Sequence, residues 1–222
     1  MKLDVDRLRN EQAEIARRIR LQPKFASLGC IQTVAAADVS CSRFSKTGYA
    51  AVVMFSFPAL RLLQEGTAVQ TLDFPYVPGY LAYREAPLID ACLAQFKERP
   101  DVLVCDGQGI AHPRGAGIAS HIGVEHGLVT VGCGKSRLVG EFVEPGRERG
   151  ARSDLMHHDQ KIGEVLRTRS NVKPLFISPG HQIDFEQATA LILALCPRFR
   201  QPEPIRAAHK RVNRMRANAL SS

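Results

Sequence analysis

Three apolar segments follow one another between residues 31 and 72, separated by short breaks. Residues 31–39 begin with β-branched side chains, residues 49–57 read YAAVVMFSF, and residues 60–72 form the third segment. Residues 42–48, between the first two segments, are polar and end in a glycine, which is typical of a turn. Pro58 separates the second segment from the third. Apolar strands with such short connections predict an antiparallel three-strand meander.

The remaining chain alternates helical and strand patterns, which predicts a single α/β domain over residues 1–222. An amphipathic helix over residues 4–22 carries Leu8, Ile15 and Ile19 at helical spacing. The further elements expected, in chain order, are a helix at 81–97 with Pro87 in its first turn, a strand at 101–106, a helix at 118–126, strands at 128–133, 161–168 and 174–178, a helix capped by Asp184, and a basic helix at 206–216. Residues 144–160 lack periodicity and predict a mobile, solvent-facing insertion.

The charge of the chain favours a polyanionic partner. The 222 residues carry a formal net charge of +8 and a pI of about 9.4, which suits nucleic acid. Six cysteines form neither a CxxC pair nor a cluster with zinc-ligand spacing, and this usage fits a reducing compartment. The charged start of the chain does not resemble a signal peptide, and no apolar run approaches a membrane span. We therefore expect a soluble, cytoplasmic protein.

Three carboxylates stand at the ends of predicted elements. The segment VLVCDGQG at 102–109 runs from a buried strand directly into Asp106, Asp38 lies near the end of the first strand, and Glu85 lies near the start of a helix. If the first and fourth strands are parallel neighbours, Asp38 and Asp106 meet at one edge of the sheet. Clustered carboxylates repel unless a cation neutralises them, and oxygen ligands select Mg²⁺ or Mn²⁺. The alternative is that each residue is separately a turn residue or a helix cap.

Four further side chains have both a functional and a structural interpretation. Lys135 follows the fifth strand, where it can contact a phosphate, although GCGKS lacks the spacing of an ATP-binding loop. His112 can hydrogen-bond a base, and His209 lies on the basic C-terminal helix. Tyr76, in a loop stiffened by two prolines, suits insertion between stacked bases. Each can equally be a solvated or structural residue.

Six segments of the chain resemble the endonuclease V family, the deoxyinosine-directed repair nucleases. They are VAAADVS at 34–40, PYVPGYLAYREAP at 75–87, VCDGQGIAHPRGAGIASHIG at 104–123, VGCGKSRL at 131–138, PLFISPGH at 174–181 and PEPIRAAH at 202–209. They occur in the order of the family and cover roughly residues 30–210. The resemblance implies an RNase H-like fold: a mixed central sheet, its antiparallel meander followed by parallel strands, with helices on both faces.

The resemblance also implies a catalytic set. Asp38 and Asp106 match the metal-binding aspartates, and Glu85, within REAP, matches the third catalytic carboxylate. Lys135 matches the motif lysine near the active site, and His209 matches the histidine near the metal or the attacking water. The cofactor implied is Mg²⁺, with Mn²⁺ able to replace it.

A second set implied by the resemblance binds the substrate. Tyr76, within PYVP, matches the tyrosine wedge that fills the gap at the lesion. Gly79, Leu81 and Gly107 fall in segments that form the pocket of a flipped hypoxanthine. His112 joins the expected substrate-binding residues on its own chemistry, because a neutral histidine can hydrogen-bond a base.

The function implied is repair of DNA that contains deaminated bases. The enzyme would hydrolyse the second phosphodiester 3′ to a hypoxanthine, leaving 3′-hydroxyl and 5′-phosphate ends, and we expect a monomer. One alternative is an endoribonuclease acting on inosine-containing RNA, since the discriminating contacts are made to the 2′-hydroxyl. Another is a non-catalytic nucleic-acid-binding protein, against which the presence of all three carboxylates argues.

Overall fold

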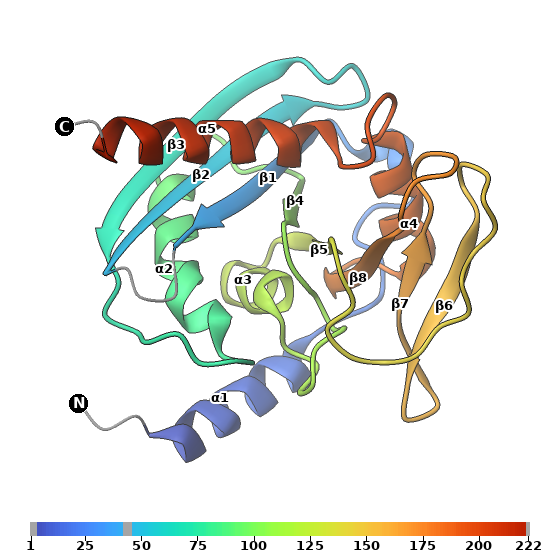
Figure 1. Ribbon diagram of the computed structural model, residues 1–222, viewed down its shortest axis with the longest axis horizontal. Coiled ribbons are helices and arrows are strands. Elements are labelled where there is room, and N and C mark those ends of the chain that lie inside the picture. The colour runs from blue at the N-terminus through green and yellow to red at the C-terminus, as the bar shows by residue number, and fades with distance from the viewer. Residues whose placement is uncertain (1–3, 42–45, 221–222) are drawn as a thin grey trace.

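The computed structural model describes residues 4–41 and 46–220, and its strands form one eight-stranded mixed sheet (Figure 1). In chain order the strands are β1 (Thr33–Ser40), β2 (Thr47–Ser56), β3 (Leu62–Thr71), β4 (Val102–Cys105), β5 (Val129–Gly134), β6 (Arg152–His157), β7 (Gln160–Leu166) and β8 (Leu175–His181). Their order across the sheet is β3-β2-β1-β4-β5-β8-β7-β6. The predicted meander is confirmed, because β1, β2 and β3 pair antiparallel. The predicted parallel strands are β4, beside β1, and β5, beside β4, whereas β8, β7 and β6 complete the sheet antiparallel.

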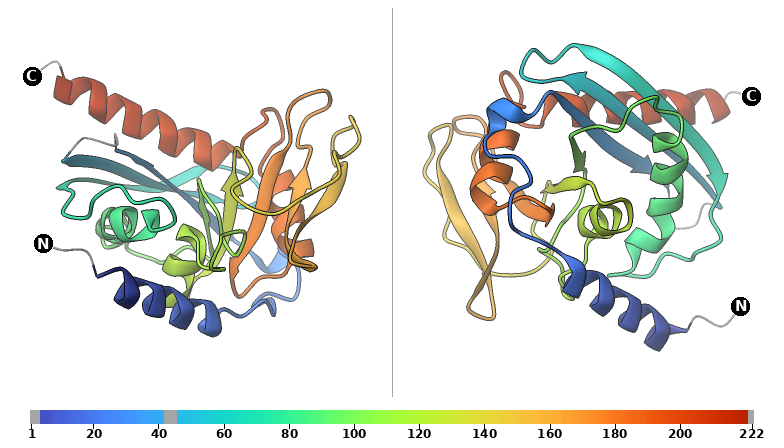
Figure 2. Two further views of the ribbon diagram at one scale, coloured as in Figure 1. Left: turned by 60° about the horizontal axis from the view of Figure 1, so that its bottom comes forward. Right: turned by 180° about the vertical axis from the view of Figure 1, so that it is seen from behind.

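Helices cover both faces of this sheet, as predicted. They are α1 (Val5–Arg18), α2 (Leu81–Leu93), α3 (Ile118–His126), α4 (Phe185–Ala194) and α5 (Glu203–Leu220), with a short 3₁₀ helix, η1 (Leu28–Cys30), before β1. The helices α2 and α3 pack on one face, and α4 and α5 pack on the other. In Figures 1 and 2, α1 lies outside α3 as a further layer.

The central strands are apolar throughout because both of their sides are covered. In β1, Val34 and Ala36 belong to the core beneath α4 and α5, whereas Ala35 and Ala37 belong to the core beneath α2. Strand β4 alternates in the same way. A strand buried on both faces reads as a continuous apolar run, which explains why these strands are recognisable in the sequence.

The expectation of an irregular insertion at 144–160 is wrong. Much of this segment belongs to a hairpin of β6 and β7, which extends the sheet at the edge beyond β8. His158 and Asp159 connect the two strands with positive φ angles of 47° and 59°, as a tight hairpin turn of type I′ requires. The hairpin was missed because its strands are rich in polar residues and its turn has no glycine.

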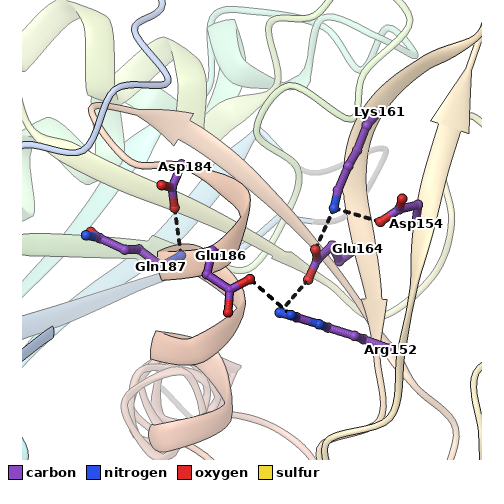
Figure 3. A network of polar contacts seen from close by, with 7 residues as sticks. All are labelled: Arg152, Asp154, Lys161, Glu164, Asp184, Glu186 and Gln187. Carbon is purple, nitrogen blue, oxygen red and sulfur yellow. Dashed lines mark hydrogen bonds and ion pairs between the residues drawn. The ribbon is translucent and has the colours of Figure 1, made fainter. Parts of the chain in front are cut away.

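Ion pairs connect the two strands of this hairpin and link it to α4 (Figure 3). Glu164 on β7 is almost fully buried, and its carboxylate lies 2.6 Å from Lys161 Nζ and 3.4 Å from Arg152. Arg152 also reaches Glu186 on α4 at 3.0 Å. The same view shows the α4 cap, where Asp184 accepts from the backbone N–H of Gln187 at 2.7 Å. The predicted cap is therefore confirmed.

Several predicted helix ends are displaced. Helix α1 ends at Arg18, because Ile19 is already extended, and α2 ends at Leu93 with Pro87 in its interior instead of its first turn. Helix α5 is longer than 206–216, since Pro204 lies in its first turn, where a missing N–H costs nothing. The predicted turn at 42–48 falls partly outside the described residues, and its last two residues belong to β2. Among the described residues, none of the helices combines the length and apolarity that crossing a membrane requires.

Candidate active site

Three parallel strands bring three predicted site residues to one edge of the sheet. Ala37 of β1 lies beside Cys105 of β4, and Cys105 lies beside Gly132 of β5. Asp38 follows Ala37, and Asp106 comes directly after β4, where its backbone N–H donates to the carbonyl of Ala37 at 3.2 Å. Lys135 comes directly after β5. The predicted adjacency of the first and fourth strands is confirmed, and the carboxyl ends of parallel strands are a common place for active sites.

Asp38 is held from the α5 side of the sheet. It continues the alternation of Val34 and Ala36, so it faces α5, whose His209 places Nδ1 3.0 Å from its carboxylate. Because an ionised carboxylate can only accept, Nδ1 donates in this contact. Asn213, one turn further along α5, contacts the other ring nitrogen of His209 at 3.0 Å.

Asp106 is held by a cation. Lys135 Nζ donates to its carboxylate at 2.5 Å, and the lysine side chain remains 41% exposed. The lysine can therefore exchange this partner for a phosphate oxygen without leaving the edge.

Glu85 completes a cluster of like charges. It lies on α2, on the opposite face of the sheet from α5, and its pKa is raised to about 8 by burial and by the charges of Asp38 and Asp106. Burial and Asp106 also raise the pKa of Asp38, to about 6, while His209 opposes the rise. The three carboxylates thus repel one another through a poorly hydrated space, which favours a cation between them.

The donors fit a hard divalent ion held by two carboxylates. Within residues 4–41 and 46–220, no group of three or more His, Cys, Asp or Glu side chains is gathered closely enough to hold an ion together. Asp38 and Asp106 are nevertheless close enough for their side chains to interact. Mg²⁺ is commonly bound by one or two carboxylates, with waters completing its octahedron. Two aspartates with oxygen donors at one sheet edge meet that requirement.

A pocket of about 400 Å³ opens beside this edge. Eight of the ten predicted site residues line it: Tyr76, Gly79, Leu81, Glu85, Asp106, Gly107, His112 and Lys135. The other two do not line the pocket: Asp38 interacts with Asp106, and His209 contacts Asp38. Asp106 is therefore shared by the carboxylate cluster and the pocket.

The loop before α2 shapes one wall of the pocket. Tyr76 is 44% exposed, and Leu81, the first residue of α2, is 38% exposed. Gly79 has a φ of +79°, and a Cβ there would lie 2.7 Å from a guanidinium nitrogen of Arg114. Only glycine meets both conditions without strain.

The segment after β4 also lines the pocket and contacts the loop before α2. A Cβ on Gly107 would lie 2.7 Å from a methyl carbon of Ile118, so a side chain would displace α3 or narrow the pocket. His112 is buried, its Nε2 lies 3.1 Å from the carbonyl of Gly79, and burial, with Arg114 nearby, lowers its pKa to about 4. His112 is accordingly a neutral hydrogen-bonding group.

The structure adds residues that the sequence did not single out. Gln12 on α1 is buried and lines the pocket, where it bonds Arg114 and Gly79. Gln108 also lines the pocket, and its side-chain amide donates to the carbonyl of Ser136 at 3.1 Å. A glutamine within the apolar stripe of an amphipathic helix was the one signal available for Gln12.

Comparison of the sequence with known proteins identifies the family. The family model for endonuclease V matches residues 13–210. The chain is 42% identical over 207 residues to an endonuclease V of Geotalea uraniireducens, covering 93% of this chain and 86% of the relative. The chain belongs to the endonuclease V family. The predicted family and fold class are therefore confirmed.

Solved structures of endonuclease V superpose on nearly the whole chain. The Streptomyces avermitilis enzyme has a TM-score of 0.91 at 38% identity, with 97% of this chain and 94% of that chain covered. The Ciona intestinalis enzyme has a TM-score of 0.83 at 26% identity, with 97% and 98% covered. The latter structure is a complex with a 24mer DNA containing an inosine followed by a ribo-adenosine.

Proposed function

We propose that this chain recognises hypoxanthine in DNA and hydrolyses the second phosphodiester on the 3′ side of the lesion, leaving 3′-hydroxyl and 5′-phosphate ends. The observation that carries the proposal is the sharing of Asp106 between a carboxylate cluster and a pocket large enough for one base. A site that tests a base and cuts beside it needs these two parts in contact. The inosine-containing DNA bound by the Ciona intestinalis enzyme supports the choice of lesion.

We propose Mg²⁺ as the cofactor, with Mn²⁺ able to replace it, held by Asp38 and Asp106. When bound, such an ion activates water and stabilises charge on a phosphate. His209 holds Asp38 through its Nδ1–H and keeps the carboxylate oriented. Glu85, from the other face of the sheet, completes the negative edge and orients water.

Lys135 supplies the positive charge on the substrate side. Its ammonium lies against Asp106 and is partly exposed, so it can approach the scissile phosphate while remaining at the edge. A positioned cation is most effective where charge develops in the transition state.

Base recognition falls to the pocket and its rim. Tyr76 fills the place of a base that has left the stack, and Gly79, Leu81 and Gly107 form the walls against which the flipped base lies. His112, neutral and buried, keeps the wall at Gly79 in place. Inside the duplex the Watson–Crick edge of the base is covered by its pairing partner. The base must therefore flip out before the pocket can read it, and flipping precedes cleavage.

A nicking assay tests the proposal directly. A duplex with one inosine is incubated with Mg²⁺, Mn²⁺ or EDTA, and the cut position is mapped. We expect cleavage at the second phosphodiester on the 3′ side of the inosine, and we expect EDTA to abolish it. Cleavage in EDTA, or equal cutting of the matched adenine duplex, would contradict it.

The metal assignment predicts a separation of binding from cleavage. Asp38→Ala or Asp106→Ala should abolish nicking with Mg²⁺, while affinity for the inosine duplex largely survives, because both variants keep Tyr76 and the pocket walls at Gly79, Leu81 and Gly107. Asp154→Ala, at an exposed aspartate of β6, is the control and should cut as the unmodified enzyme does. Near-normal nicking by Asp38→Ala would remove Asp38 from the metal site.

RNA is the second candidate substrate. The ribo-adenosine after the inosine in the Ciona intestinalis complex favours it, since that enzyme accommodates a 2′-hydroxyl beside the lesion. Cleavage rates on matched inosine-containing DNA and RNA strands decide between the two. We further propose that the chain acts as a single-domain, cytoplasmic monomer, a compartment that the six free cysteines support.

A further inference from the structure

The segment between α4 and α5 carries an arginine that reaches the backbone of the active-site lysine. One terminal nitrogen of Arg200 donates to the carbonyl of Lys135 at 3.1 Å and to that of Pro174 at 2.8 Å. Its Nε donates to the carbonyl of Lys173 at 2.7 Å. Lys135 directly follows β5, whereas the other two residues directly precede β8. One side chain therefore joins the ends of two neighbouring strands.

Arg200 acts where the backbone ladder between these two strands stops. The last pair of β5 with β8 is Gly134 with Phe176. Pro174 has no N–H with which to continue the ladder toward β5. The guanidinium supplies donors at this point instead. Among the described side chains, that of Arg200 alone donates to the Lys135 carbonyl.

The backbone of Arg200 is itself fixed by buried side chains. Thr168 Oγ1 donates to the Arg200 carbonyl at 2.5 Å, and the Cys196 thiol donates to the same oxygen at 3.4 Å. Thr168 and Cys196 are each only 1% exposed. The guanidinium thus extends from an anchored position, and hydrogen bonds from a charged donor are stronger than those between neutral groups.

Lys135 depends on its backbone position because its side chain is long and partly free. The ammonium lies 2.5 Å from the Asp106 carboxylate, while the side chain is 41% exposed. A lysine stem is flexible, so the place where it starts decides whether the ammonium can meet Asp106 and a phosphate together. Gln108 holds the next carbonyl, that of Ser136, and Arg200 holds that of Lys135 itself.

We propose that Arg200 is a positioning residue for cleavage that acts through Lys135, which rests on the proposed role of Lys135 at the scissile phosphate. Arg200 does not line the base pocket, so its effect is not on the base. Without the guanidinium, the Lys135 carbonyl loses its side-chain donor, and Gln108 alone holds the start of this loop. A misplacement of about 1 Å can cost up to about 10²-fold in rate.

The experiment is a double-mutant cycle on the rate of nicking. Arg200→Met, Lys135→Met and the double variant are compared with the unmodified enzyme in single turnover, with Mg²⁺ and saturating inosine duplex, so that changes in affinity do not enter. Arg200→Lys keeps the charge, but one ammonium cannot span three carbonyls as the planar guanidinium does.

Arg198→Met is the matched control. It removes the same charge from the same segment, but Arg198 is 76% exposed and pairs with Glu203. Urea unfolding of each variant establishes that it is folded under the assay conditions.

Arg200→Met should lower the nicking rate by about tenfold or more, and Arg200→Lys should recover only part of that loss. In the Lys135→Met background, the same substitution should change the rate by less than about threefold, because the side chain through which Arg200 acts is gone. Arg198→Met should nick at the unmodified rate.

Three results would overturn the proposal. An unchanged rate in Arg200→Met shows that Lys135 needs no such anchor. An equal fold-loss with and without Lys135 shows that the arginine supports the fold or another group. A full rate in Arg200→Lys shows that the charge alone matters.

If Arg200→Met does not fold, Arg200→Lys is compared in the two Lys135 backgrounds and decides alone. Failure of the proposed function is seen separately. An unmodified enzyme that leaves the inosine duplex intact, or a Lys135→Met variant that nicks at the full rate, contradicts that function, and the role of Arg200 falls with it.

Discussion

At the scale of single residues, Tyr76 combines an exposed ring with a rigid setting. It lies between Pro75 and Pro78, is 44% exposed and borders the pocket, so little entropy is lost when it contacts a duplex. Tyr76→Ala should weaken binding to inosine DNA by about tenfold or more, because one aromatic–base stack contributes about 1–3 kcal/mol. The single-turnover rate at saturation should change little.

Tyr76→Phe is the matched control, since it keeps the ring and should keep most of the affinity. Binding is followed by fluorescence anisotropy and cleavage by gel. If Tyr76→Ala leaves both affinity and lesion preference unchanged, the tyrosine is not a wedge.

His112 links the pocket to acid stability. Its pKa falls from an ordinary 6.5 to about 4, chiefly through burial, with Arg114 adding to the effect. The unfolded chain therefore takes up a proton below pH 6.5, whereas the folded protein does not until about pH 4. Folding stability is unaffected above pH 6.5 and declines between pH 6.5 and 4, by at most about 3 kcal/mol from this residue.

His112→Gln does not titrate and keeps an N–H for Gly79. Its unfolding free energy should depend less on pH between 6.5 and 4 than that of the unmodified protein, as measured by urea unfolding at several pH values. Comparing slopes removes the contribution of His121 and His181, whose pKa values are also lowered by burial. Identical slopes would show that His112 titrates normally in the folded protein.

At the scale of elements, burial decided what the sequence could predict. Strands β1 and β4 are covered on both sides, so their apolar runs predict the strands. The same runs mark Asp38, which follows the apolar part of β1, and Asp106, which follows β4. The hairpin of β6 and β7 was not predictable, since its buried Glu164 is satisfied by cations that lie near it only once the chain has folded. The hydrogen bonds of Gln12 escaped prediction for the same reason, because its partners lie 67 and 102 residues away.

Glu164 should anchor the hairpin. Its side chain is 5% exposed and lies close to Lys161 and Arg152, so Glu164→Gln removes the buried charge that compensates half-buried Lys161 and exposed Arg152. We expect a loss of about 1–3 kcal/mol in the free energy of unfolding, measured with urea. Nicking should persist under native conditions, because the site is built on β1, β4 and β5.

Glu186→Gln is the control for this element. Glu186 meets the same Arg152 but is 72% exposed, and exposed ion pairs contribute about 0–1 kcal/mol. Equal losses in the two variants would show that burial of Glu164 adds nothing to the ion pair.

At the scale of the whole molecule, the positive charge is unevenly compensated. On α1, Arg7, Arg9, Arg17 and Arg18 each lie within 3.6 Å of a carboxylate. Helix α5 carries four arginines and one lysine against a single glutamate. The same helix supplies His209 to Asp38, so its excess charge lies beside the carboxylate edge, where a phosphate backbone would pass.

Lys210 and Arg214 are two of the exposed members of this excess, and neither has an ion-pair partner in the part of the chain that the structure describes. If both contact phosphates, the double substitution to alanine should reduce the slope of log Kd against log salt by roughly 2, since each contact contributes about 0.9. The change should be equal for inosine and adenine duplexes, because phosphate contacts carry no base information.

The matched control replaces Arg9 and Arg17 of α1 by alanine. This removes the same amount of positive charge, but both arginines are already paired with carboxylates, so the slope should stay nearly unchanged. If the α1 and α5 double substitutions change the salt slope equally, α5 contributes only its share of the net charge. If the change is confined to the inosine duplex, Lys210 and Arg214 contact the lesion itself.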